Sequence, residues 1–187
     1  MLSFKTVSWM PAVKLNTCKY LIVYLTIMRS NFSLSSPLSQ KQKIVWSLIS
    51  KGLSVSTIAN KLSTTRQYVN QTRLTAEAKL STTLLEVARA NDLQVTRLYP
   101  KEAILLGYHP ALKRKAIVTY STNYGIKVWY WHDNPEEVTN EEFLKQTRIY
   151  LLDIVKERGI QLEDTAKIHP ATLARIIFSK LVPEVES

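Results

Sequence analysis

Residues 38–80 contain two short runs with helical apolar spacing, a Gly-Leu-Ser turn between them, and a third run that is polar and cationic. In the first run, Ser39 is placed to cap a helix, and Gly52 stands where a left-handed residue commonly ends one. The apolar residues at helical spacing are Ile44, Val45, Leu48 and Ile49. The pattern predicts a helix closed by a glycine turn, and it constrains the fold more than any other segment.

The second and third runs repeat this organisation. Ser54 is placed to cap a second helix, and Ser63-Thr64 breaks its period. Thr65 is placed to cap a third helix that begins at Arg66. The inward stripe of the second helix consists of Val55, Ile58, Ala59 and Leu62. The order of these elements is that of a helix-turn-helix.

The third run carries side chains that match base edges. Arginine can bridge the two acceptors of guanine, and Asn or Gln can bridge the donor and acceptor of adenine. A recognition helix presents its N-terminal residues to the major groove. The candidate base contacts are Arg66, Gln67, Tyr68, Asn70 and Gln71. Val69, Leu74 and Ala76 are expected to face inward.

Other residues are better placed to bind phosphates, which position a protein on DNA without reading its sequence. The candidate phosphate contacts are Lys43, Lys51, Lys61, Thr65, Arg73, Lys79, Lys113, Arg114 and Lys115. The alternative interpretation of residues 38–80 is a helical hairpin whose polar face only meets solvent.

The segment GLSVSTIANKL followed by STTRQYV resembles the tetrahelical helix-turn-helix of LuxR-type regulators and of sigma factor region four. It is closer to the archaeal Tfx-type DNA-binding proteins. The positions that carry the resemblance are Leu38, Ser39, Gln42, Gly52, Leu53, Ser54, Ile58, Ala59, Leu62, Thr64, Thr65 and Arg66. The chain departs from the pattern at Ser63, where such families often have glycine, and at Tyr68, where a smaller polar residue is usual.

The resemblance implies sequence-specific binding of double-stranded DNA and control of transcription. The partners that it implies are DNA, a second copy of the chain, and RNA polymerase or general transcription factors. We expect no cofactor, no membrane association and a cytoplasmic location.

The charge distribution agrees with this interpretation. The 187 residues carry a net charge of +10. Residues 28–92 hold nine basic and three acidic residues, whereas residues 135–187 hold seven basic and ten acidic ones. The positive field is therefore concentrated on the predicted helix-turn-helix and the segment that follows it. Charge alone would suit RNA equally well.

After the third run, Leu84, Leu85 and Ala88 extend the helical period towards a stop at Asn91. They belong to a fourth helix or to one long continuation of the third. In the resembled fold this element often contacts a second subunit. Packing of this face on the chain's own first helix is the alternative.

From Leu93 the pattern changes to alternation with β-branched and aromatic residues. We expect a strand at residues 93–98, a short helix from Pro100 closed by Gly107, and a hairpin whose turn is residues 122–125. A capping box from Thr139 to Glu142 begins a helix that stops at Gly159, and Pro170 begins the last helix.

The hairpin is rich in aromatic residues, and two interpretations compete. Its aromatic and basic side chains can stack on nucleic-acid bases. Alternatively they form core, because alternation places Ile126, Val128 and Tyr130 on one face and Trp129 and Trp131 on the other.

No catalytic or metal centre is expected. His109, His132 and His169 are scattered, and the nearest approach to a catalytic cluster is His132-Asp133 beside Glu136-Glu137. The single cysteine, Cys18, excludes an internal disulfide framework.

The predicted organisation is α+β and mostly helical. Residues 1–36 are an N-terminal extension and lead-in, 37–91 a tetrahelical helix-turn-helix, and 92–187 a small α+β domain with a β-hairpin and two C-terminal helices that serves dimerisation or regulation. The abrupt change at Met28 suggests the hypothesis that translation starts there. The sequence thus favours a dimeric DNA-binding transcriptional regulator without enzymatic activity. The alternatives are an RNA-binding protein that uses the hairpin, and a DNA-targeting accessory protein of a mobile element.

Overall fold

The computed structural model describes residues 36–131, 140–163, 165 and 167–185. These residues belong to one compact unit, Ser33–Ser187. Cys18, the proposed start at Met28 and most of the expected lead-in lie outside the described residues, as does the His132–Glu137 segment.

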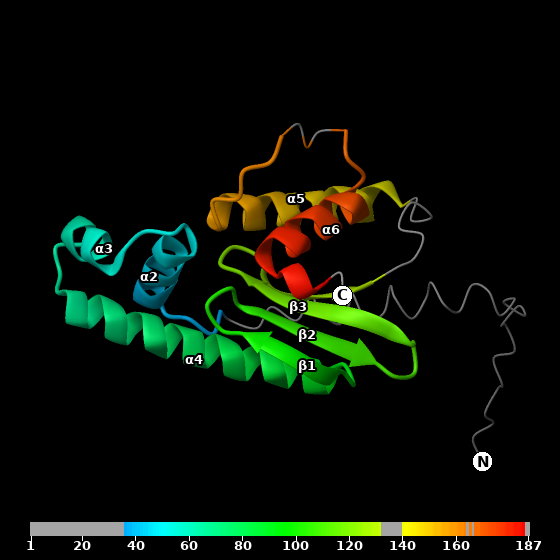
Figure 1. Ribbon diagram of the computed structural model, residues 1–187, viewed down its shortest axis with the longest axis horizontal. Helices are drawn as coiled ribbons and strands as arrows, with labels where there is room; N and C mark the ends of the chain where they lie inside the picture. The colour runs from blue at the N-terminus through cyan, green and yellow to red at the C-terminus, as the bar shows by residue number, and fades with distance from the viewer. Residues whose placement is uncertain (1–35, 132–139, 164, 166, 186–187) are drawn as a thin grey trace, which may run out of the picture. The chain divides into compact units, whose positions relative to one another are not determined.

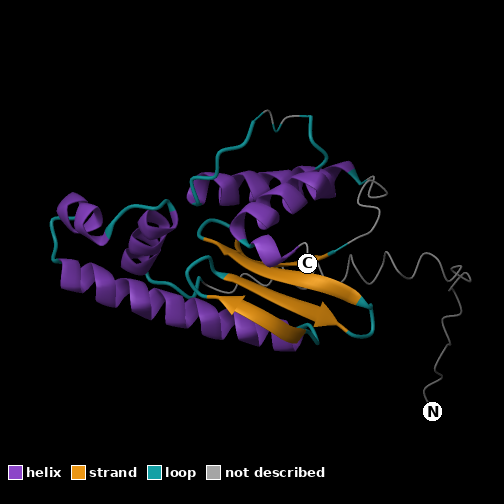
Figure 2. Ribbon diagram, in the orientation of Figure 1, coloured by secondary structure: helices purple, strands orange, loops and turns teal. Residues whose placement is uncertain are grey.

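The fold is α+β, as the sequence predicts (Figures 1 and 2). The described part of the chain begins with three helices, continues with a four-stranded sheet, and ends with two helices and a short 3-10 turn. The elements are α2 (Gln40–Ser50), α3 (Val55–Lys61), α4 (Arg66–Ala90), β1 (Gln94–Tyr99), β2 (Ile104–His109), β3 (Arg114–Ser121), β4 (Gly125–Tyr130), α5 (Glu141–Glu157), α6 (Pro170–Leu181) and η2 (Pro183–Val185).

The sheet is an antiparallel meander in the order β1-β2-β3-β4. Its last two strands form the predicted hairpin, in which Ser121 pairs with Gly125. Gly125 has φ +72°, a left-handed conformation that glycine adopts without steric cost.

The short helix expected between Pro100 and Gly107 is wrong, because Ile104–His109 is strand β2. Ile104 and Leu105 are both fully buried, in different cores on opposite faces of the sheet. A strand buries neighbouring residues on two faces, which one face of an amphipathic helix does not do. Gly107 lies inside the strand and does not end a helix.

The sheet is covered on both faces (Figure 1). On one face Ile126, Val128 and Tyr130 pack with α4 residues such as Leu80. On the other face Trp129 packs with Tyr150 of α5 and Phe178 of α6. The side chains of β4 therefore alternate between two cores, which confirms the core interpretation of the aromatic hairpin.

Helix α4 is a single helix of 25 residues, which is the long continuation that the sequence left open as an alternative to a fourth helix. Residues 37–91 therefore contain three helices and not the tetrahelical arrangement expected. The inward stripe of α4 continues without a break from Val69 to Ala88. Of the two alternatives for the Leu84-Leu85-Ala88 face, the structure favours packing within the chain, because Leu84 and Ala88 are fully buried in a core with Trp46 of α2 and with the sheet. The reason is that the sheet supplies an apolar face along the second half of α4.

No boundary between separate cores lies at residues 91/92. Trp46 of α2 is fully buried in the same core as Tyr120 of β3, and the two rings meet edge to face with centroids 5.4 Å apart. Helices α2 and α4 and one face of the sheet therefore share one hydrophobic core, whereas α3 packs in a separate small core with α2 and α4.

The C-terminal helices agree with the sequence pattern apart from one cap. Asn140 rather than Thr139 caps α5, with its side-chain oxygen accepting from the Phe143 N–H at 2.9 Å. Gly159 follows α5 with φ +61°, and Pro170 is the first residue of α6, both as expected. Among the described residues, no helix combines the length and apolar character needed to cross a bilayer.

Candidate nucleic-acid interface

Each of the first three helices begins at the residue that the sequence indicates. Ser39 and Gln42 form a reciprocal capping box at the start of α2. The Ser54 Oγ accepts from the Thr57 N–H at 3.1 Å, and the Thr65 Oγ1 accepts from the Tyr68 N–H at 3.1 Å. The starts of α3 and α4 are therefore set by local hydrogen bonds.

A small core joins the three helices. It contains Val45 of α2, Ile58 and Ala59 of α3, and Val69 of α4, all of them buried. Full burial of a side chain such as Ile58 or Val69 contributes about 1.5–3 kcal/mol relative to exposure. This packing holds the first two turns of α4 against α2 and α3.

The candidate base-contact residues flank buried Val69 in the sequence, and all of them are exposed. They are Arg66, Gln67, Tyr68, Asn70 and Gln71. At 100° per residue, Gln67, Asn70 and Gln71 lie on one face of α4, at spacing i, i+3 and i+4. Arg66 and Tyr68 lie on opposite flanks of that face. The structure thus places amide groups in the centre and a guanidinium and a phenol at the sides.

The expectation that Leu74 faces inward is wrong, because its side chain is 50% exposed. Ala76 is fully buried, as expected. Leu74 follows Gln67 by seven residues, so it continues the face of Gln67, Asn70 and Gln71. Sequence reasoning missed it because a leucine in a helix is usually core, although its spacing from Val69 already places it off the inward stripe.

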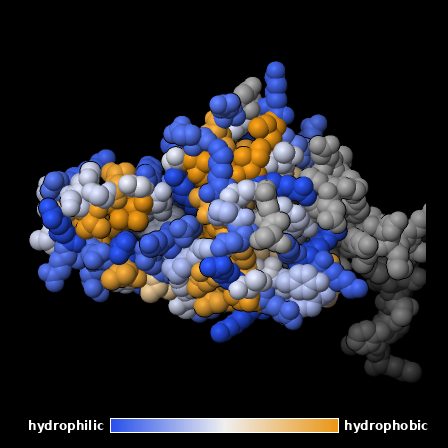
Figure 3. Space-filling view, viewed as in Figure 1, coloured by the Kyte–Doolittle hydropathy of each residue, from blue (hydrophilic) through white to orange (hydrophobic). Residues whose placement is uncertain are grey.

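The surface around the start of α4 is cationic. Lys51 and Lys61 are exposed near the C-terminal ends of α2 and α3, and Lys43 is partly exposed on α2. No acidic residue occurs in residues 28–76. In Figure 3, hydrophilic side chains surround a hydrophobic area over α2 and α3. Opposing charges are thus absent from this stretch of sequence, and an anionic partner is favoured there.

Two of the candidate phosphate contacts on α4 already have partners within the chain. The Arg73 Nε lies 3.8 Å from a Glu77 carboxylate oxygen, and the Arg73 side chain is only 25% exposed. The Lys79 Nζ donates to the Gln42 Oε1 at 3.2 Å. The Lys79 contact is an exposed, weak interaction that an anion could replace, whereas the contacting atoms of Arg73 and Glu77 are buried.

Lys113, Arg114 and Lys115 lie far from the start of α4. Lys115 pairs with Tyr108, which in turn pairs with Gln94, and Gln94 begins the strand that follows α4. The basic triplet is therefore at the end of the sheet next to the C-terminus of α4. Because 25 helical residues span about 37 Å, the triplet and Arg66 are at opposite ends of this helix.

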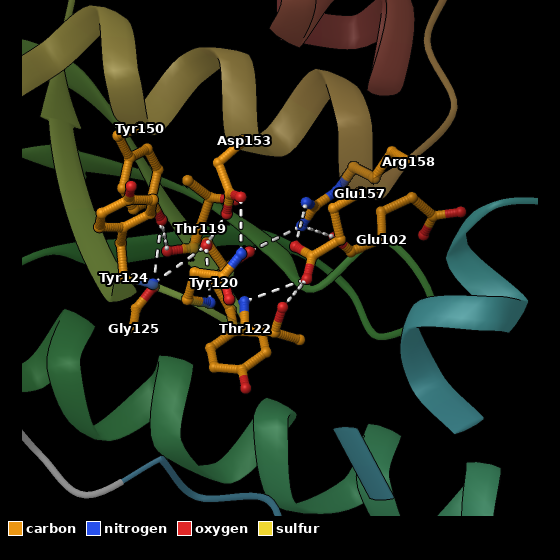
Figure 4. Close-up of polar contacts among 12 residues, drawn as sticks. Glu102, Thr119, Tyr120, Thr122, Tyr124, Gly125, Tyr150, Asp153, Glu157 and Arg158 are labelled. Carbon is orange, nitrogen blue, oxygen red and sulfur yellow. Dashed lines mark hydrogen bonds and ion pairs between the residues drawn. The ribbon is translucent and has the colours of Figure 1, made fainter. Parts of the chain in front are cut away.

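Sequence reasoning did not anticipate a buried ionic cluster at the end of α5 (Figure 4). The Arg158 guanidinium donates to the Glu157 carboxylate at 3.2 Å and to the backbone oxygens of Glu102 and Tyr120 at 3.0 and 2.8 Å. It also lies over the Trp46 ring, 5.3 Å from the centroid. Burial raises the pKa of the Glu157 carboxyl and lowers the pKa of Arg158.

This cluster connects α5 with the β3–β4 turn and with α2. The Thr122 N–H donates to the Glu157 Oε1 at 3.1 Å, and Asn123 donates to Asp153 at 2.7 Å. At Gly159, a side-chain carbon would stand 3.7 Å from the Lys51 carbonyl oxygen. The end of α5 therefore supports the end of α2, although no residue type in the sequence marks this pairing.

Comparison with known proteins adds no relative, since no family model, curated protein or solved structure matches this chain. Within the described residues, no group of three His, Cys, Asp or Glu side chains is arranged to hold a metal ion.

Proposed function

We propose that α2, α3 and the start of α4 form a helix-turn-helix that binds double-stranded DNA and reads its sequence in the major groove. The observation that carries the proposal is the exposed polar face at the start of α4, on the side of the helix away from buried Val69. Gln67, Asn70 and Gln71 supply amides for adenine, and Arg66 supplies a guanidinium for guanine.

The cationic surroundings support this role. Lys51 and Lys61 are exposed at the ends of the two preceding helices and would contact phosphates, as would Lys43 and the Thr65 hydroxyl. The Lys113-Arg114-Lys115 triplet would contact a different part of the duplex, because it lies at the other end of α4.

Duplex DNA suits this surface better than RNA does. The deep, narrow major groove of A-form RNA does not admit such a helix, and single-stranded RNA is bound mainly by exposed aromatic rings. Trp129 of the hairpin packs in the core between the sheet and the C-terminal helices, and Tyr120 is fully buried. Tyr124 is the one exposed aromatic residue of the hairpin, so the hairpin has few rings to offer to bases.

In this proposal the protein is a transcriptional regulator that acts as a homodimer and contacts RNA polymerase or general transcription factors. Two-fold pairing would place two recognition helices about 34 Å apart on DNA. The pairing surface must differ from Leu84, Leu85 and Ala88, since that face packs inside the chain. Service as the DNA-targeting subunit of a mobile element remains the second candidate, because it would use the same surface.

The test begins with selection of bound sequences from random duplex DNA and footprinting of the upstream region of the protein's own gene. The variant Arg66→Ala/Gln67→Ala is then compared with Lys61→Ala. We expect the double variant to relax base preference, by about 1–3 kcal/mol for each lost bidentate pair. Lys61→Ala should weaken all duplexes alike and reduce the salt slope by about one.

Lys156→Ala, an exposed lysine on α5, is the matched control and should change neither quantity. Equal behaviour of the double variant and Lys61→Ala would contradict a recognition role for the start of α4. Preference for single-stranded RNA over every duplex would contradict DNA binding itself. A protected palindrome upstream of the gene favours the regulator over the mobile-element role.

A further inference from the structure

Leu74 has the most exposed large hydrophobic side chain in the described part of the chain, at 50%. It lies on α4, three residues after Gln71 and four after Asn70, and so continues their face of the helix. The residue at the next position on this face, Ala78, is also exposed and adds no charge. A single apolar side chain therefore extends a row of amides.

Leu74 belongs to none of the hydrophobic cores of the described residues. The buried residues of α4 are Val69, Ala76, Leu80, Leu84 and Ala88. Leu74 is turned away from this stripe, since it follows Val69 by five residues and precedes Ala76 by two. Half of the Leu74 side chain is exposed to water, and this exposed surface contributes no hydrophobic stabilisation.

The surroundings of Leu74 favour an anionic partner that also presents a small apolar group. Residues 28–76 contain no acidic side chain, and Lys51, Lys61 and Arg66 are exposed. Glu77, one turn after Leu74, has a side chain that is only 12% exposed and lies beside Arg73. In the major groove of DNA, the C5-methyl group of thymine is the apolar feature that a leucine can contact. DNA thus offers both the charge and the apolar group.

We infer that Leu74 is a specificity-determining residue that contacts the C5-methyl group of one thymine next to the bases read by Asn70 and Gln71. This inference rests on the proposed function. It adds a thymine preference that hydrogen-bonding residues alone would not produce. The alternative role of an exposed leucine at this position is a contact with another protein. The experiment separates a thymine contact from a protein contact.

The experiment uses the full chain and the duplex obtained by selection from random DNA. Each thymine is replaced in turn by deoxyuridine, which removes only the methyl group, and the dissociation constant is measured. At one thymine, we expect the substitution to weaken wild-type binding about fourfold, which corresponds to about 0.8 kcal/mol for one buried carbon group. Leu74→Ala should bind the thymine duplex about fourfold more weakly and no longer distinguish thymine from deoxyuridine at that position.

Two variants serve as controls. Leu74→Met keeps an apolar side chain and should retain the discrimination. Leu152→Ala removes a leucine that is 37% exposed on α5 and should show the wild-type pattern. Because Leu74 is outside the cores, circular dichroism of Leu74→Ala should match that of the wild type.

The inference is overturned if Leu74→Ala keeps the full deoxyuridine effect, or if no thymine of the selected duplex responds in the wild type while duplex binding persists. A loss of self-association in Leu74→Ala with an unchanged deoxyuridine pattern would assign Leu74 to a contact between copies instead. These results leave the proposed function standing. Absence of any duplex binding by the wild type would remove both.

Discussion

Ser63 adopts a left-handed backbone conformation, with φ 49°, between α3 and α4. Its N–H donates to the Asn60 carbonyl oxygen at 3.2 Å, and the next residues lead directly into the Thr65 cap. For a residue with a Cβ this conformation costs about 1–2 kcal/mol. The position thus has a backbone geometry that glycine adopts without this cost.

We expect Ser63→Gly to raise the free energy of unfolding by about 0.5–1 kcal/mol. Relief of the left-handed strain is partly offset by the greater freedom of glycine in the unfolded chain. Urea denaturation measures the change. Ser81→Gly in the middle of α4 is the control, and it should lower stability because glycine is a poor helix former. A loss of stability in Ser63→Gly would show that the serine side chain contributes more than its strain costs.

The residues of the candidate interface differ in how far the sequence could place them. Arg66, Asn70 and Gln71 were predictable because the cap at Thr65 sets the phase of α4. Leu74 was assigned to the core by residue type, although its spacing from Val69 already places it off the inward stripe, and its side chain is 50% exposed. Residue type thus suggested the first three correctly and misplaced the last.

At the scale of elements, β2 illustrates how packing can determine secondary structure. Ile104 and Leu105 are neighbours that enter different cores, and Ala103 before them has φ 50°. Gly107 in this strand approaches β1 closely, since a Cβ there would stand 3.1 Å from the Gln94 carbonyl oxygen. The glycine allows the two backbones to pair at this point.

We expect Gly107→Ala to lower the free energy of unfolding by about 1–3 kcal/mol, the usual cost of excess volume in a packed site. The obstructing atom belongs to the backbone of a paired strand and cannot move aside easily. Intrinsic preference alone predicts the opposite sign, because glycine weakens a strand relative to alanine. A neutral or stabilising result in chemical denaturation would therefore mean that the close approach is unimportant.

The continuity of helix α4 also depends on packing against residues that are distant in sequence. The start of α4 belongs to the candidate interface and its second half covers the sheet. The helical period continues through residues 74–84, and no glycine or proline interrupts it. The sequence nevertheless left open whether a separate fourth helix begins there. The unbroken stripe from Val69 to Ala88 follows from partners that are distant in sequence.

At the scale of the whole described unit, the candidate interface and the C-terminal helices are joined through shared buried groups. Trp46 contacts Tyr120 in the core and Arg158 through its ring face. Arg158 is 8% exposed and Glu157 is 5% exposed, so the pair is almost removed from water. Removal of one partner leaves the other charge buried without compensation.

We expect Arg158→Met to lower the free energy of unfolding by about 3–5 kcal/mol. Tryptophan fluorescence and far-UV circular dichroism should report the same single transition in the wild type and in the variant, because the cores are connected. Lys156→Met, an exposed neighbour on α5, is the control and should stay within about 0.5 kcal/mol of the wild type. Two separated transitions in Arg158→Met would mean that the first three helices and the C-terminal layer unfold independently.

The sequence by itself determined what depends on neighbouring residues. Caps at Ser39, Ser54 and Thr65, and the left-handed turns at Gly52 and Gly125, arise from hydrogen bonds and steric limits within a few residues, so they could be read along the chain. Alternation along β4 predicted its two-sided burial for the same reason.

Only the tertiary structure decided what depends on residues distant in sequence. The strand at Ile104, the uninterrupted α4 and the distance of Lys115 from Arg66 all follow from which surfaces the sheet covers. The burial of Arg158 belongs to the same group. Apolar periodicity shows which face of an element is buried, but hydrophobic burial is non-directional and does not specify the partner surface, so these features became defined only when the chain packed.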